Sequence, residues 1–207
     1  MSKSCLEGID RIVRNWFHTN VGEDVAGSIR HANRMVGCVN DDPQAYKWVV
    51  LALHSALQGA CVCHLTTSAG SLGAVTEGSK RNTIDYHEKS RTDKTAQAPK
   101  AYLMPLPDLL KAVRKPNSAG NPGNNEGICI SEEDMEWLNW LHASRNEFVH
   151  FKSKSWSCYV SDIPELAKLI SRIIQDILDV RWAFRHQDPE QIQELEESLK
   201  QLAQINL

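Results

Sequence analysis

The sequence predicts an all-α protein, and two observations lead to this prediction. Apolar residues recur at every third or fourth position along much of the chain, which is the spacing of one face of an α-helix. No stretch sustains the alternation of apolar and polar residues that indicates a half-buried strand. The chain has 207 residues, of which 42% are hydrophobic, and this length is sufficient for one domain with a full core. We therefore expect a bundle of four to five core helices, with further helices at both ends.

The first part of the chain, residues 1–40, is expected to be a helical extension. Between residues 9 and 17 the apolar positions are three and four apart, which predicts a short amphipathic helix. A second helix is expected over residues 25–36, although Gly27 within it and Gly37 directly after it weaken the pattern.

Four helices are expected to form the core of a domain spanning residues 41–187. The first follows Asp42 and Pro43, an N-cap and a first-turn proline, and is apolar on nearly all sides. Such a helix belongs in the middle of a bundle. An acidic helix is expected at residues 188–207, after the dipeptide Asp188-Pro189. The expected core helices cover residues 44–65, 105–113, 131–150 and 162–186.

Two polar segments interrupt these helices. Residues 66–100 are rich in Ser, Thr, Gly, Lys and Asp, and we expect a mobile polar loop there. A loop of this length is either functional or disordered, and the sequence leaves both alternatives open. Residues 115–127 contain several prolines and glycines, which predict a second flexible loop.

Charge and composition limit the classes of function. The net charge of −3 excludes a strongly basic surface for nucleic acid, although a small basic site remains possible. There is no long uninterrupted apolar run and no signal-peptide pattern, so we expect a cytoplasmic protein with no membrane contact. The six cysteines form no CxxC pair and are expected to be reduced. The segment from Cys61 to His64 has no second ligand pair, so neither a metal site nor a cofactor is expected.

The strongest functional signal lies at the end of the helix expected over residues 131–150. Arg145 can bind phosphate oxygens with two hydrogen bonds and offset negative charge in a transition state. His150 can transfer protons near neutral pH. Asn146 can orient a histidine ring or a ribose hydroxyl. These residue types suit the cleavage of a phosphodiester without a metal ion.

Arg145 and His150 are five residues apart, which places them about 140° apart around an ideal helix. They converge on one ligand only through the length of the arginine side chain, a distortion at the helix end, or a second copy of the protein. This geometry favours a symmetric dimer.

The six residues 145–150 resemble the motif of the HEPN family, in which an arginine and a histidine are separated by four to six residues. In that family Asn, Asp or His commonly follows the arginine directly, and here Asn146 does. The resemblance covers residues 44–186 and implies a HEPN-like helical bundle and a metal-independent endoribonuclease. It further implies a homodimer with the two motifs facing each other. A role as a toxin or antiviral-defence effector, controlled by an antitoxin or regulatory protein, is also implied.

Three other pairs of arginine and histidine have a comparable separation, but they lack the context of a core helix followed by an amphipathic helix. These pairs are Arg11 and His18, Arg81 and His87, and Arg181 and His186.

Other polar residues are assigned smaller roles. Lys152 and Lys154 follow the motif and are candidates for binding RNA phosphates, or they belong to a solvated turn. His142 is expected to be an exposed polar residue. His54 and His64 are expected to be hydrogen-bonded within the core. A second hypothesis for the whole chain is a catalytically silent HEPN-like module that binds a nucleotide, a nucleic acid or a protein.

Overall fold

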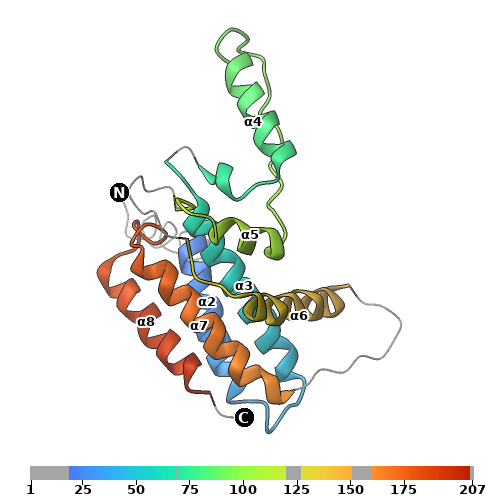
Figure 1. Cartoon of the computed structure of the whole chain (residues 1–207), viewed down its shortest axis with the longest axis vertical. Coiled ribbons are helices and arrows are strands. Elements are labelled where there is room, and N and C mark those ends of the chain that lie inside the picture. Colours follow the sequence, from blue (N-terminus) through green and yellow to red (C-terminus); the bar gives the residue numbers. More distant parts are fainter. Residues whose placement is uncertain (1–18, 69, 120–126, 151–159, 206–207) are drawn as a thin grey trace, which may run out of the picture.

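The computed structural model describes residues 19–68, 70–119, 127–150 and 160–205, and these form an all-α bundle (Figure 1). The described residues contain two isolated β-bridges and no strand. The all-α prediction is therefore confirmed, while a HEPN-like arrangement of the helices stays a prediction. The elements are α2 (Val21–Val36), α3 (Ala45–Leu65), η1 (Ser71–Gly73), α4 (Glu77–Lys89), α5 (Leu106–Val113), α6 (Glu132–Val149), η2 (Val160–Asp162), α7 (Ile163–Asp179) and α8 (Pro189–Ala203).

Helix α3 lies at the centre of the bundle and contacts α2, α5, α6 and α7 (Figure 1). Its residues are buried on nearly every side; Leu53 and Leu57, for example, are fully buried. By length and composition alone this helix could cross a membrane. However, most of its surface is covered by neighbouring helices, as in the core helix of a soluble protein.

The helices at the two ends of the chain belong to the same core as the middle helices. Helix α2 packs against α3 and α8, and α8 also packs against α7. One continuous cluster of buried residues includes Ile29 of α2 and Leu199 of α8. At Gly59 the two helices α2 and α3 approach so closely that a Cβ atom would lie 2.7 Å from a methyl group of Val25. The core therefore continues across the expected domain boundaries at residues 41 and 188.

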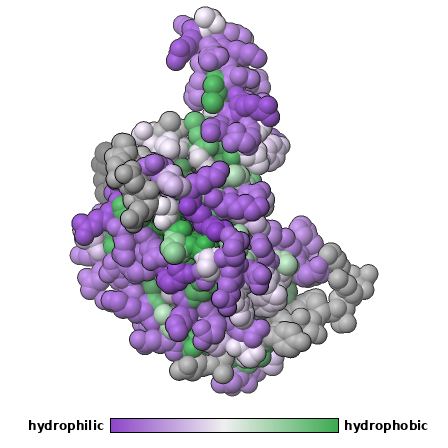
Figure 2. All heavy atoms as spheres, viewed as in Figure 1, coloured by the Kyte–Doolittle hydropathy of each residue, from purple (hydrophilic) through white to green (hydrophobic). Residues whose placement is uncertain are grey.

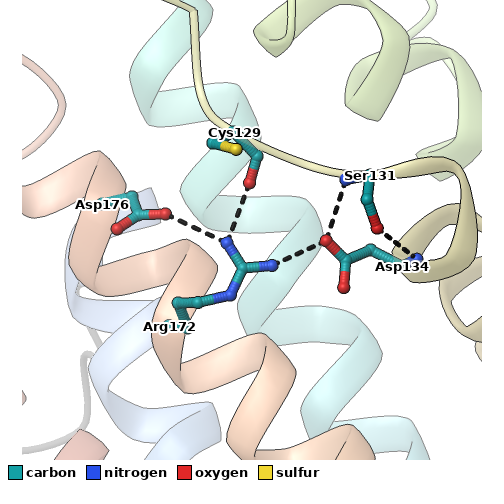
Figure 3. A network of polar contacts seen from close by, with 5 residues as sticks. All are labelled: Cys129, Ser131, Asp134, Arg172 and Asp176. Carbon is teal, nitrogen blue, oxygen red and sulfur yellow. Dashed lines mark hydrogen bonds and ion pairs between the residues drawn. The ribbon is translucent and has the colours of Figure 1, made fainter.

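The start of α6 is fixed by a capping box and by an arginine from α7 (Figure 3). The hydroxyl of Ser131 accepts the backbone N–H of Asp134 at 3.0 Å, and Asp134 Oδ2 accepts the N–H of Ser131 at 2.9 Å. Arg172 donates to the same carboxylate oxygen at 2.7 Å and to the carbonyl of Cys129 at 2.9 Å. These contacts anchor the helix that carries the candidate site.

The expected helix over residues 162–186 is shorter in the structure, because α7 ends at Asp179. Arg181 then adopts a left-handed backbone conformation, with φ of 58°, which an α-helix does not permit. Trp182 donates its indole N–H to the carbonyl of Thr66 at 2.8 Å. The chain thus turns into a connection before α8 begins.

The prediction of a loop over residues 66–100 is wrong in part, because this segment contains the helix α4. Helix α4 and the chain that returns from it form an arm that stands away from the bundle (Figure 1). On the face that Figure 2 shows, the arm is mostly hydrophilic. Its exposed residues include the hydrophobic Ile84, and only Ser79 of α4 is buried. The expected helix over residues 9–17 and most of the expected loop at 115–127 lie outside the described residues.

Candidate active site

The predicted site lies at the C-terminal end of α6. Arg145 and Asn146 are half-buried on the last turns of the helix. His150 is the exposed residue that ends the helix, and its backbone N–H donates to the carbonyl of Asn146 at 3.0 Å. No hydrogen bond joins the ring of His150 to the side chain of Arg145 or Asn146. Lys152 and Lys154 lie outside the described residues, so their roles stay predictions.

A chain of hydrogen bonds runs from Arg145 into the core of the protein. Arg145 Nη1 donates to Asn146 Oδ1 at 3.0 Å. Asn146 Nδ2 lies 3.2 Å from Nε2 of His142. The other ring nitrogen of His142, Nδ1, lies 3.0 Å from Nε2 of His54 on α3. The two rings are stacked, with centroids 5.3 Å apart and an angle of 24° between their planes.

The arginine sets the direction of every bond in this chain. A guanidinium group has only donors, so it fixes the oxygen of Asn146 toward Arg145 and the amide NH₂ toward His142. Nε2 of His142 must then accept a hydrogen bond, and its proton resides on Nδ1. Because Nδ1 of His142 donates, Nε2 of His54 accepts. Both rings are therefore neutral, and their tautomers are defined.

Burial and charge favour the same neutral state. His54 is only 3% exposed. Burial, the nearby Arg145 guanidinium and His142 together lower the pKa of His54 from 6.5 to about 4. Burial and Arg145 also lower the pKa of the half-buried His142. Near neutral pH the site thus combines one cationic group with two uncharged imidazoles.

This arrangement can bind an anion at the end of α6. The contact with Asn146 engages one of the five N–H groups of a guanidinium, so Arg145 can also bind two oxygens of a phosphate. The neutral histidines add no positive charge of their own, and His142 contacts the amide of Asn146 directly.

The two cysteines on α3 are not suited to nucleophilic chemistry. Cys61 and Cys63 are buried free thiols. Burial raises the pKa of both to about 12, and for Cys61 the neighbouring Cys63 adds to the effect. A thiol with such a pKa is protonated at neutral pH and unreactive.

The structure changes the interpretation of one histidine and confirms that of two others. His142 was expected to be exposed, but it is half-buried and hydrogen-bonded through both ring nitrogens. Its position four residues before Asn146, on the same helix face, is a signal that indicates the contact between them. His54 and His64 are hydrogen-bonded in the core, as predicted.

Comparison of the chain with protein-family models, with characterised proteins and with solved structures finds no match. The assignment to the HEPN family therefore stays a prediction, carried by the motif at residues 145–150.

Proposed function

We propose that this protein is a metal-independent endoribonuclease whose site lies at the C-terminal end of α6. The observation that carries the proposal is the ordered pair of Arg145 and Asn146 at a partly exposed helix end, with His150 exposed directly after it. A fixed cation and an accessible imidazole are together the groups that suit the cleavage of RNA by its own 2′-hydroxyl. Arg145 binds the phosphate and stabilises its developing charge, and His150 transfers protons.

The proposed site is completed by a second copy of the chain. Because no hydrogen bond joins the side chains of His150 and Arg145 in one copy, the two residues act together most simply across a two-fold axis. Asn146 orients the site, and Lys152 and Lys154 bind RNA phosphates beside it. Such an enzyme would act in the cytoplasm as a toxin or defence effector under the control of an antitoxin or regulatory protein.

A second candidate function is a catalytically silent module that binds nucleotide, nucleic acid or protein. The observation in its favour is the same separation of His150 from Arg145, because binding an anion requires the arginine alone. The two functions predict different effects of removing His150. The enzyme would lose the cleavage of bound RNA, whereas the silent module would bind RNA as before.

The first experiment compares cleavage of a labelled RNA pool by the wild type and by His150→Ala, with EDTA present. We expect the wild type to leave 2′,3′-cyclic phosphate ends and the variant to be at least about 100-fold slower. His87→Ala is the matched control, because His87 is also exposed and also follows an arginine in the sequence. RNA binding without cleavage by any of the three proteins would instead support the silent module.

A mixing experiment tests whether the site spans two copies. Arg145→Ala and His150→Ala are each expected to be inactive as pure proteins. After subunit exchange, half of the dimers are mixed, and each has one complete site and one site that lacks both residues. The mixture should therefore recover about a quarter of wild-type activity. No recovery, with exchange shown by differently tagged subunits, would place both residues in one copy.

A further inference from the structure

We propose that His54 and His142 are positioning residues of this site, and that they hold Asn146 and Arg145 in place only while both rings are neutral. The inference rests on the proposed function for what the site does. It adds two residues outside the motif and a dependence of the site on their protonation.

The contacts form one unit that begins in the core. His54 lies on the central helix α3 and is fixed by its apolar surroundings. His142 is 3.0 Å from it, Asn146 is 3.2 Å from His142, and Arg145 is 3.0 Å from Asn146. The half-buried guanidinium of Arg145 is thus held in place by a chain of contacts that begins at His54, a residue that cannot move freely.

Adding a proton breaks this unit. A protonated His142 has a donor at Nε2, which faces the donor NH₂ of Asn146. Rotating the amide would satisfy His142, but the NH₂ group would then face Arg145, which also only donates. A protonated His54 likewise presents a donor to the donor Nδ1 of His142. No orientation of Asn146 satisfies all partners once His142 is charged.

The surroundings of the pair oppose protonation. Among the described residues, the charged or titratable groups that act on His54 are Arg145 and His142, and Arg145 acts on His142. No carboxylate is among the groups that shift the pKa of either ring. Burial acts in the same direction.

Stability does not account for the pair. A hydrogen bond between a buried and a half-buried polar group contributes little net free energy to folding. Apolar side chains of similar shape at both positions would change the stability little. The rest of α3 around His54 is apolar and well packed. A positioning role explains why histidine, which carries both a donor and an acceptor, stands at both positions.

Nitrogen-15 NMR of the histidine rings tests the geometry without any activity. We expect both rings to carry their proton on Nδ1 at pH 7. His54 should remain neutral as the pH falls to 5.5, and His142 should titrate below the usual range of histidine. The two protons of the Asn146 side-chain amide should give sharp, slowly exchanging signals, which His142→Leu abolishes and His142→Gln retains. A ring of His142 protonated on Nε2, or a shared titration of both rings near pH 6.5, would overturn the proposal.

Kinetics of RNA cleavage test the consequence for the site. His142→Leu is expected to lower kcat about 10- to 100-fold through misplacement of Arg145. His142→Gln restores both a donor and an acceptor, so it should recover much of the loss and remove any acid limb of the pH profile that His142 causes. His54→Leu and His54→Gln should show the same order, with His87→Leu as the control.

The outcomes separate this inference from the proposed function. If the wild type cleaves RNA and His142→Leu cleaves it equally fast with the same pH profile, the positioning role is wrong. The proposed ribonuclease function is then still supported. If the wild type cleaves no RNA, the ribonuclease is wrong. The NMR signal of Asn146 then decides whether the histidine pair orders Arg145 for binding alone.

Discussion

His64 is a fully buried histidine whose two ring nitrogens differ in their surroundings. Nε2 lies 2.8 Å from the hydroxyl of Ser118, and that hydroxyl donates its own proton to the carbonyl of Val113 at 2.8 Å. Nε2 must therefore carry the ring proton and donate to Ser118. Nδ1 is buried and has no hydrogen-bond partner among the described residues. Ser118 is thus the contact through which this ring is satisfied.

Replacing Ser118 by alanine tests the importance of that contact. The substitution leaves a buried N–H of His64 without its partner, while the carbonyl of Val113 keeps the N–H of Ile128. The free energy of unfolding is expected to fall by about 1–3 kcal/mol. Urea unfolding at pH 7 measures the change. Ser161→Ala, at an exposed position, should change stability by less than about 0.5 kcal/mol. Equal effects of the two substitutions would contradict this interpretation of His64.

At the level of single residues, the sequence indicates some members of the candidate site and gives no signal for others. The motif at 145–150 is a local pattern, so it is visible without a structure. The contact between His54 and His142 joins residues 88 positions apart, and no local spacing predicts it. The contact between His64 and Ser118 likewise joins residues 54 positions apart. The polar partners of buried histidines depend on how the helices pack, and this information is not local.

Among the elements, α6 and α7 are joined by a small polar network at the surface (Figure 3). Asp134 serves both the capping box of α6 and the ion pair with Arg172. Burial alone raises the pKa of Asp134, but the contacts with Ser131 and Arg172 outweigh it, so the pKa lies below its usual value. One carboxylate therefore joins the start of one helix to the middle of the next.

Arg172→Ala is expected to lower the free energy of unfolding by about 1 kcal/mol. The expected loss of stability is small because the arginine side chain is 41% exposed and exposed ion pairs contribute little. The lost bond to the carbonyl of Cys129 adds to the effect. Thermal unfolding measures it, and Lys168→Ala on the same helix is the control, because Lys168 is exposed. A larger effect of the control would show that helix propensity, and not the network, dominates.

Helices with an apolar face are predicted well, and those without one are missed. The expected helices at 44–65, 105–113 and 131–150 agree with α3, α5 and α6 to within one residue at each end. Helix α4 has no apolar face to bury, so periodicity does not reveal it. The end of α7 was missed because Arg181 adopts a left-handed conformation without a glycine or proline to indicate it.

For the whole molecule, the buried histidines couple stability to pH. Burial lowers the pKa of His54 and of His64 from 6.5 to about 4. As the pH falls below about 6.5, the unfolded chain binds protons at these positions and the folded protein does not. The resulting stability is present in full above pH 6.5 and is lost progressively down to about pH 4. Each shift corresponds to roughly 3 kcal/mol.

We expect the midpoint of urea unfolding to fall steadily between pH 6.5 and pH 4.5. A loss of this size is a large fraction of the stability of a typical domain. His54→Gln and His64→Gln, singly and together, should flatten the dependence on pH, whereas His87→Gln at an exposed position should not. A midpoint that stays constant from pH 6.5 to pH 5 would contradict the neutral state of both rings.

The arm that carries α4 leaves the bundle and returns to it at the same place. The N–H of Thr76 donates to the carbonyl of Tyr102, and the N–H of Met104 to that of Ala74, both at 2.9 Å. Because these bonds close the base, the core does not depend on how long the arm is, and the entropy of closing a loop changes only slowly with its length. Residues 77–100 are therefore a segment that can be replaced without disturbing the core. A foreign domain whose own ends lie close together can replace them while α6 and the site at its end keep their places.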